Sequence, residues 1–236
     1  MTRASIKFLS VAFIAALPML ASAQLTGNVS LTSNYKFRGQ DQDASKTRAV
    51  KPALQGGFDY SFGDTGFYVG NWNSSVNWLA GNALESDVYG GYKFKLGGAD
   101  LDVGLLTYLY PGNRSGNTTE AYGAATFGPV TAKYSHTLSR DYFAYAGPGQ
   151  KGRNTGYLNI AFAQEVAPSV TLKVAVGFTR FGGDITAPNF MDYSVGGAYD
   201  FGSGVSLGAA VVGANKQAYF GAVNQSRVVV TLTKTL

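Results

Sequence analysis

Residues Leu25–Gly39 read LTGNVSLTSNYKFRG and alternate between two kinds of side chain. The odd-numbered positions up to Phe37 are apolar, aromatic or small, whereas every even-numbered position from Thr26 to Arg38 is polar. Successive side chains of a strand point to opposite faces, so this pattern predicts a strand with one apolar and one polar face. About 13 residues at about 3.3 Å each would span about 43 Å, and a tilted transmembrane strand needs only about 9–11 residues. The stretch therefore predicts a membrane β-barrel.

The same alternation recurs along the remaining chain and predicts eleven further strands. These are Val50–Phe62, Gly66–Trp78, Leu84–Lys95, Asp100–Tyr110, Thr118–Phe127, Val130–Ser139, Asn154–Glu165, Val170–Phe181, Phe190–Phe201, Val205–Gly213 and Ser226–Leu236. Together with the first stretch they predict an all-β fold, a membrane-spanning, antiparallel up-and-down β-barrel of twelve strands. An even number of antiparallel strands is typical of single-chain bacterial outer-membrane barrels.

The connections between the predicted strands alternate in length. Connections after even-numbered strands are short, for example Gly63–Thr65 and Gly128–Pro129, whereas those after odd-numbered strands are generally longer, for example Arg140–Arg153 and Ala214–Gln225. Short periplasmic turns and long extracellular loops are the plan of an outer-membrane barrel. The final predicted strand runs to Leu236. It can therefore pair with the first strand and close the barrel.

The first 23 residues, MTRASIKFLSVAFIAALPMLASA, have the pattern of a secretory signal peptide. Arg3 and Lys7 provide a positive start, Phe8–Leu17 an apolar core, and the last three residues a small-x-small cleavage site. The apolar core is too short to span a bilayer as a helix, which needs about 17–25 residues. We therefore predict that residues 1–23 are a cleaved signal peptide and that residues 24–236 form the barrel domain, exported to the outer membrane of a Gram-negative bacterium.

The composition supports a closed β structure in contact with outer-membrane lipid. The chain has 31 glycines, 15 tyrosines and 15 phenylalanines, but only 14% of its residues are charged. This mixture suits barrels with aromatic girdles. The chain has no cysteine, which excludes disulfides, thiol catalysis and zinc–thiolate sites. Although the formal net charge is +5, lysine and arginine nowhere form a run, so we expect no nucleic-acid partner.

Five segments in the first half of the chain have a distinctive content of aromatic residues and glycine. They are Ser33–Gly39, Pro52–Tyr60, Gly66–Trp72, Glu85–Tyr92 and Tyr108–Gly112 (SNYKFRG, PALQGGFDY, GFYVGNW, ESDVYGGY and YLYPG). In these segments the chain resembles the TorF family of porins, conserved hypothetical proteins of Gram-negative bacteria. The resemblance implies an outer-membrane barrel with a porin-like role, and it implies no particular substrate.

The sequence shows no catalytic or metal-binding constellation. Its one histidine, His136, shares a face with Tyr134 and Leu138 and is expected to face lipid. Outer-membrane phospholipases have a serine two residues after their catalytic histidine, where this chain has Leu138, so we expect no enzyme. Asp41 and Asp43 offer two carboxylates, but a calcium site needs about 6–8 oxygens. We expect a solvated loop there, no metal and no cofactor.

The predicted lumen carries charges of opposite sign near its outer end. In an up-and-down barrel the odd-numbered strands run towards the long loops and the even-numbered strands run away from them. The position of each charged residue along the barrel axis can therefore be estimated from its place in its strand. Three basic residues on the first and last strands and three acidic residues on the fourth and sixth strands share the outer level: Lys36, Arg38 and Arg227, and Glu85, Asp87 and Glu120. We predict that a basic wall faces an acidic wall and selects small polar solutes or ions. The alternative is that they are ordinary solvated or ion-paired lumen charges.

One predicted hairpin has a register that can be derived from its side chains. Pairing Phe94 with Leu101 on the apolar face places Lys93 opposite Asp102 on the polar face. Apolar residues then meet outside the barrel and opposite charges meet inside it. We predict an ion pair in the lumen between Lys93 and Asp102.

The width of the pore is left open by the sequence. About eight strands give a filled interior and 16–18 leave a clear channel, so twelve lies between these cases. Tyr89, Tyr108 and Tyr110 belong to the lumen face, and the loop Arg140–Arg153 can fold inwards. We predict a passive diffusion channel for small polar solutes. The alternatives are a non-conducting, occluded barrel with a structural or loop-mediated binding role, and a soluble periplasmic β protein; the oligomeric state also stays open.

Overall fold

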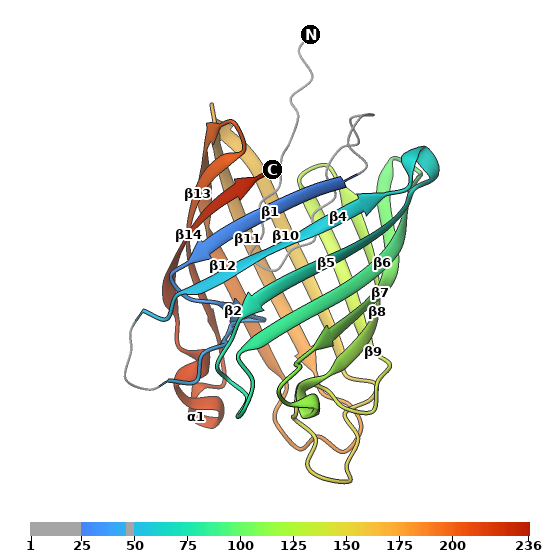
Figure 1. The fold of residues 1–236 in the computed structure, drawn as a ribbon, viewed down its shortest axis with the longest axis vertical. Coiled ribbons are helices and arrows are strands. Elements are labelled where there is room, and N and C mark those ends of the chain that lie inside the picture. The colour runs from blue at the N-terminus through green and yellow to red at the C-terminus, as the bar shows by residue number, and fades with distance from the viewer. Residues whose placement is uncertain (1–24, 46–49) are drawn as a thin grey trace.

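The computed structural model describes residues 25–45 and 50–236, which form a closed barrel of twelve antiparallel strands (Figure 1). The barrel strands are β1 (Leu25–Thr32), β4 (Ala53–Ser61), β5 (Phe67–Ser75), β6 (Leu84–Leu96), β7 (Ala99–Leu109), β8 (Thr118–Phe127), β9 (Val130–Thr137), β10 (Gly156–Ala167), β11 (Val170–Arg180), β12 (Phe190–Gly202), β13 (Val205–Ala214) and β14 (Arg227–Thr235). Neighbours in sequence pair, and β1 pairs with β14 to close the sheet. The predicted fold class is confirmed. The predicted signal peptide, residues 1–23, lies outside the described residues.

The remaining elements are short and belong to the connections. They are β2 (Lys36–Phe37), β3 (Gln40–Asp41), the 3₁₀ helices η1 (Gly63–Thr65), η2 (Arg114–Gly116) and η3 (Gly221–Asn224), and the helix α1 (Gln217–Phe220). Within residues 25–45 and 50–236, no helix has the length and apolar character needed to span a bilayer.

The alternation of the sequence becomes an outside and an inside of the barrel. Val29, Leu31 and Leu54 expose 42%, 55% and 61% of their surface. On the opposite face of the same sheet, Thr32 and Ser74 are buried. An apolar outer surface around a polar interior inverts the arrangement of a water-soluble protein and suits a barrel whose outer face contacts lipid.

Short turns and long loops lie at opposite ends of the barrel (Figure 1). Residues 97–98, 128–129, 168–169 and 203–204 form two-residue turns at the end where the C-terminus lies. The connections at the other end are longer, up to the stretches 33–52 and 138–155. The predicted alternation of turns and loops is therefore confirmed.

Aromatic side chains gather on the strands at the short-turn end. The ring centroids of Tyr60 and Phe62 are 5.0 Å apart, those of Phe67 and Tyr92 4.7 Å, and those of Tyr199 and Phe201 4.8 Å. Amphipathic rings at this level suit the boundary between lipid tails and headgroups.

The first strand is shorter than the alternation predicts, which corrects one prediction. β1 ends at Thr32, and the chain then turns into the barrel as a two-stranded hairpin of β2 and β3. Its turn residues Arg38 and Gly39 have φ angles of 48° and 76°. Two successive positive φ angles match the tight type I′ turn, and glycine supplies one of them without steric cost. We call residues 34–42 the inner hairpin.

Candidate functional site

The inner hairpin connects opposite walls of the barrel near its long-loop end (Figure 1). On one side Tyr35 donates a hydrogen bond to Glu85 of β6 at 2.8 Å. On the other side the tip residue Gly39 lies against Asp192 of β12 and Gly213 of β13. In the closed sheet, five strands separate β6 from β12 in either direction. The hairpin therefore crosses the lumen from one side to the other.

Arg38 attaches the turn of the hairpin to a third part of the wall. Its Nη1 and Nη2 donate to the two carboxylate oxygens of Glu120 on β8 at 3.0 and 2.7 Å, and Nη1 also donates to the Tyr142 hydroxyl at 2.8 Å. The guanidinium lies 4.2 Å from the ring centroid of Tyr157 on β10. Arg38 and Glu120 are 8% and 1% exposed. A buried, bidentate ion pair beside an aromatic ring fixes both the position and the orientation of the Arg38 guanidinium.

Glu85 is bound by two tyrosine hydroxyls. Tyr35 donates to Oε1 at 2.8 Å and Tyr110 donates to Oε2 at 2.9 Å. Asp87, two residues along β6, is also buried, and its Oδ1 has no hydrogen-bond partner among the described residues. Both acidic residues of β6 are thus buried, and Glu85 contacts the hairpin directly. Neither residue lines an open lumen.

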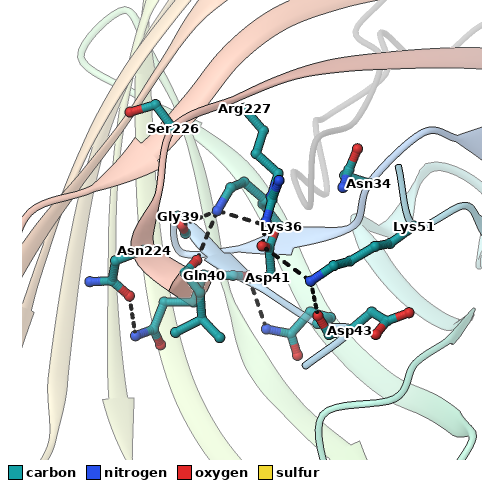
Figure 2. Close-up of polar contacts among 12 residues, drawn as sticks. Asn34, Lys36, Gly39, Gln40, Asp41, Asp43, Lys51, Asn224, Ser226 and Arg227 are labelled. Atoms are coloured by element: carbon teal, nitrogen blue, oxygen red, sulfur yellow. Dashed lines mark hydrogen bonds and ion pairs between the residues drawn. The ribbon is translucent and has the colours of Figure 1, made fainter. Parts of the chain in front are cut away.

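Asp41 is the centre of a cluster of cations (Figure 2). Lys36 Nζ lies 3.3 Å from Oδ1, whereas Arg227 Nε and Lys51 Nζ lie 2.7 and 3.7 Å from Oδ2. Lys36 also donates to the carbonyl oxygens of Gly39 and Val223, each at 2.9 Å. The three cations come from β2, from the segment that returns to β4, and from β14. The cluster therefore joins the hairpin to the strand that closes the barrel.

The loop between β9 and β10 folds onto the hairpin, which is one of the two arrangements that the sequence leaves open. Phe143 lies 5.2 Å from Phe37 and 4.8 Å from Tyr108, measured between ring centroids. The Tyr145 hydroxyl donates to Gln40 Oε1 at 2.6 Å, and the amide of Gln40 donates to Asn224 at 2.8 Å. Apolar packing and hydrogen bonds from two outer loops thus hold the hairpin in the lumen.

The charged residues predicted to line the lumen lie elsewhere than expected, because part of the predicted first strand forms the inner hairpin. Lys36 and Arg38 lie on the inner hairpin and not on the wall, because β1 ends before them. Arg38 pairs directly with Glu120, and Lys36 and Arg227 both pair with Asp41. Of the basic and acidic residues predicted to face each other across an open lumen, Arg38 and Glu120 thus form a direct ion pair, whereas Lys36 and Arg227 pair with an acidic residue outside the predicted set. The expected solvated loop at Asp41 is also wrong, because that residue is 3% exposed.

The predicted contact between Lys93 and Asp102 is found as a register but not as an ion pair. The two residues lie directly opposite each other on β6 and β7. No ion pair in the described part of the chain joins them, because both side chains interact with Tyr68 instead. Its hydroxyl donates to Asp102 at 2.7 Å, and Lys93 Nζ lies 4.4 Å from its ring centroid.

Burial and pairing change the acidity of the hairpin's polar side chains. Burial lowers the pKa of Lys36 to about 8, although Asp41 favours its charged form. Burial alone would lower the pKa of Arg38, but Glu120 more than offsets this and holds the pKa above its ordinary value. Burial, with Glu85 beside the hydroxyl, raises the pKa of Tyr35. At neutral pH the hairpin thus presents cationic Lys36 and Arg38 and a neutral Tyr35.

A pocket of about 120 Å³ lies between the hairpin and the wall formed by β4 and β5. Most of its lining side chains are polar: Asn34, Asp41, Gln42, Asp43, Lys51, Ser75 and Asn77, with the ring of Tyr35. The pocket is therefore polar, and Asp41 and Lys51 both belong to its lining.

The one histidine, which was considered for catalysis, does not line this pocket. His136 lies beside Tyr134 on β9, where the tyrosine is 48% exposed on the outer face, and a ring nitrogen of His136 lies 3.3 Å from Asn154 Oδ1. Within the described ranges, no group of three or more acidic, histidine or cysteine residues is arranged to hold a metal ion.

Sequence reasoning missed Asp41 as an interior residue and Tyr142 as a partner of Arg38. The dipeptide Arg38-Gly39 is the one local signal for the turn that brings Asp41 opposite Lys36, since glycine favours positive φ angles. No local signal identifies Tyr142 as the partner of Arg38, because the two residues are 104 positions apart.

We expect Gly39→Ala to weaken the docking of the hairpin and, if the barrel conducts, to increase its conductance. A Cβ at this position would lie 2.6 Å from both the Cβ of Asp192 and the carbonyl oxygen of Gly213. Gly202→Ala is the matched control, because Gly202 has a similar φ of 82° but no atom within 4 Å of the added Cβ. Single-channel recordings of the two variants separate the clash from backbone strain. Equal conductance in both would contradict tight docking of the tip.

Comparison with protein families gives one match along nearly the whole chain. Residues 19–236 match the family described as "Bacterial protein of unknown function (Gcw_chp)". No protein with a curated description matches. The family name predicted from the five segments, TorF, is not confirmed by this match.

Solved structures with a similar fold include two porins and an outer membrane channel. The KdgM porin is 9% identical, with a TM-score of 0.58 over 89% of this chain and 98% of that chain. The NanC porin is 12% identical, with a TM-score of 0.56 over 89% and 98% of the two chains. The COG4313 outer membrane channel from Pseudomonas putida F1 is 13% identical, with a TM-score of 0.51 over 97% and 100%. At such identities the similarity establishes the barrel fold.

Proposed function

The chain belongs to the Gcw_chp family of bacterial proteins of unknown function, and we propose that it is a porin-like outer-membrane channel for passive diffusion of small polar solutes or ions. The observation that carries this proposal is the charged hairpin that crosses the lumen of a closed barrel. Pores select solutes by placing fixed charges at a constriction.

The polar interior supports a channel. A barrel that served only as a membrane anchor would need no buried charges on its inner face, because burying charge is costly unless partners are supplied. Here Lys36, Asp41 and Glu120 are each 3% exposed or less and are held in place by specific partners. We infer that the hairpin sets the width of the passage, and that the six predicted lumen charges act on solutes from there: Lys36, Arg38, Arg227 and Glu120 within ion pairs, and Glu85 and Asp87 as acidic groups beside the hairpin.

The dense packing of the outer lumen favours a second candidate, an occluded barrel that does not conduct in its resting state. Tyr110, Glu85 and Glu120 are each 1% exposed, and Phe143 packs on the hairpin from the loop side. Such a barrel would act through its outer loops or open only when the hairpin moves. The two candidates differ in one property, the resting conductance.

The proposed setting follows from the same features. The apolar outer face is proposed to contact outer-membrane lipid, and residues 1–23 are proposed to be a signal peptide for export. One similar structure is the KdgM porin in complex with disordered oligogalacturonate, 10% identical, with a TM-score of 0.54 over 89% of this chain and 97% of that chain. A polar saccharide is thus bound in that complex, and we propose small polar solutes for this chain. We also propose that the chain is not an enzyme, has no nucleic-acid partner, and is a TorF-type porin.

Recording from the purified barrel in a planar bilayer tests the proposal directly. We expect discrete conductance steps and a reversal potential in a salt gradient that departs from zero. Migration on a gel that changes on heating would establish that the sample is a folded barrel. Folded protein without conductance would favour the occluded barrel, and extraction from cells without detergent would contradict both.

A further inference from the structure

Four basic residues are exposed at the long-loop end of the barrel, beside the outer ends of β9, β10 and β11 (Figure 1). Two contacts bring their segments together. The amide of Gly152 donates to the carbonyl oxygen of Arg140 at 2.7 Å, and Arg180, the last residue of β11, lies directly opposite Gly156 at the start of β10. We call the four cations the basic rim: Arg140, Lys151, Arg153 and Arg180.

The side chains of the basic rim have no partners within the protein. None of the four takes part in an ion pair or a side-chain hydrogen bond with another residue of the ranges 25–45 and 50–236. Two acidic residues belong to the same connections. The carboxylate of Asp184 accepts a hydrogen bond from the backbone amide of Lys151 at 2.9 Å, and Asp141 accepts one from Ser139 through its carbonyl oxygen. Four cations against two carboxylates leave the region with a positive excess.

The basic rim begins where the apolar outer face ends. Arg180 follows Phe178 by two residues on the outer face of β11, and Phe178 is 43% exposed. Arg140 follows Leu138, which is 42% exposed, by the same interval. Two residues of a strand span about 7 Å. In a membrane, cations immediately beyond an apolar band lie at the level of the lipid headgroups, which their long side chains can reach.

The cations are confined to one side of the barrel. At or beside the outer ends of β5, β6, β13 and β14, the exposed residues are uncharged: Ser75, Leu84, Asn215 and Ser226. Arg114 and Lys216, the other exposed cations at this end of the described chain, lie singly in separate loops. A charge that served only to keep the loops hydrated would need no such concentration. The clustering indicates a local, anionic partner.

Uncharged polar groups continue the basic rim along the outer face. His136 and Arg180 both lie opposite Gly156, one on each side of it. A Cβ on Gly156 would lie 2.5 Å from the Tyr134 hydroxyl oxygen, so this hydroxyl covers the glycine. The same hydroxyl lies 3.4 Å from Nδ1 of His136, and Nε2 of His136 lies 3.3 Å from Asn154 Oδ1. Hydrogen-bonding groups thus stand beside Arg180, above the apolar band.

We propose that the basic rim binds the phosphate groups of outer-leaflet lipids, with Arg140 and Arg180 as the principal contacts. Arginine presents two parallel N–H donors that match the geometry of a phosphate. The phosphate supplies the negative charge that no residue provides, the acyl chains lie on the apolar face below, and Tyr134 and His136 hydrogen-bond to the remainder of the headgroup. This proposal rests on the outer-membrane setting proposed above and does not depend on conduction.

Native mass spectrometry of the detergent-solubilised barrel tests the site with lipid A as the probe. We expect lipid A to bind about tenfold more tightly than lipid A from which the phosphates have been removed, and Arg140→Gln/Arg180→Gln to abolish this preference, because charge-assisted hydrogen bonds are lost. Arg114→Gln/Lys216→Gln is the matched control, since it removes two exposed cations from other loops at the same end. The control should bind lipid A as the unaltered protein does.

The outcomes separate the lipid site from a site for free anions and from the channel. An unchanged preference in Arg140→Gln/Arg180→Gln, or equal binding of both lipids to the unaltered protein, would overturn the site. Displacement of lipid A by inorganic phosphate would assign the cations to a free anion and overturn the lipid as partner. If the double variant fails to fold, judged by its migration on a gel with and without heating, Arg180→Gln alone decides. A barrel that binds lipid A but does not conduct would refute the channel and leave the lipid site standing.

Discussion

Replacing residues 33–52 by an Asn-Gly turn is expected to raise single-channel conductance several-fold, the largest change that we predict for this barrel. Thr32 and Ala53 lie directly opposite each other on β1 and β4. A two-residue turn therefore joins the strands without a change of register. The replacement removes the inner hairpin and leaves all twelve barrel strands in place.

A matched control replaces a connection that has no part in the lumen. Ser61 and Tyr68 are opposite each other on β4 and β5 at the short-turn end, so an Asn-Gly turn in place of residues 62–67 is the equivalent change there. We expect this control to conduct as the unaltered protein does. A variant without the hairpin that folds but conducts no more than the control would show that another part of the barrel limits the current.

Arg38→Met is expected to undock the inner hairpin in an otherwise intact barrel. Methionine keeps much of the volume but leaves Glu120, which is 1% exposed, without its cationic partner. Removing one partner of a buried ion pair destabilises the folded arrangement by about 3–5 kcal/mol. This corresponds to a change in the docking equilibrium of about 150- to 4,000-fold. Hydrogen exchange of residues 34–42, followed by mass spectrometry, should accelerate by up to that factor.

A double variant distinguishes the ion pair from simple loss of packing. Arg38→Met/Glu120→Met removes both charges and leaves none unpaired, so its hairpin should exchange more slowly than in the single variant. Lys95→Met, at the exposed pair with Asp100, should leave exchange of the hairpin unchanged. Exchange in Arg38→Met at the rate of the unaltered protein would mean that the aromatic contacts hold the hairpin without Arg38.

The fold follows from the sequence because its determinants are periodic and local. Alternation places Val29 and Leu31 outside, and it also sets the pairing of Phe94 with Leu101. The predicted barrel, strand number and closing pair of β1 with β14 are confirmed. The error at the end of β1 has the same origin: Tyr35 and Phe37 continue the alternation, but their rings pack on Trp72 and Phe143 inside the barrel.

The sequence predicts which charged residues belong to the candidate site, but not which residues they contact. Five of the six predicted charges are buried at the level of the hairpin, and the sixth, Arg227, is half-buried beside them. Their partners depend on one turn at Arg38 and Gly39, and a turn of two residues is a weak signal within a long alternating stretch. Tyr68 likewise separates Lys93 from Asp102, although it is distant from both in sequence. Contacts across the lumen join residues that are far apart in the sequence, and no local pattern encodes which of them meet.

The contact between Asp41 and Arg227 also constrains the order of barrel assembly. These residues are 186 positions apart, and Arg227 begins the strand that closes the sheet. Long-range contacts form late, because the entropy of closing a long loop must be paid before they are made. The hairpin therefore receives its last anchor only when the final strand arrives. In a nascent barrel the inner hairpin would therefore stay loosely held until β14 pairs with β1. The sheet would close, and the hairpin would become fixed across the lumen, in the same step.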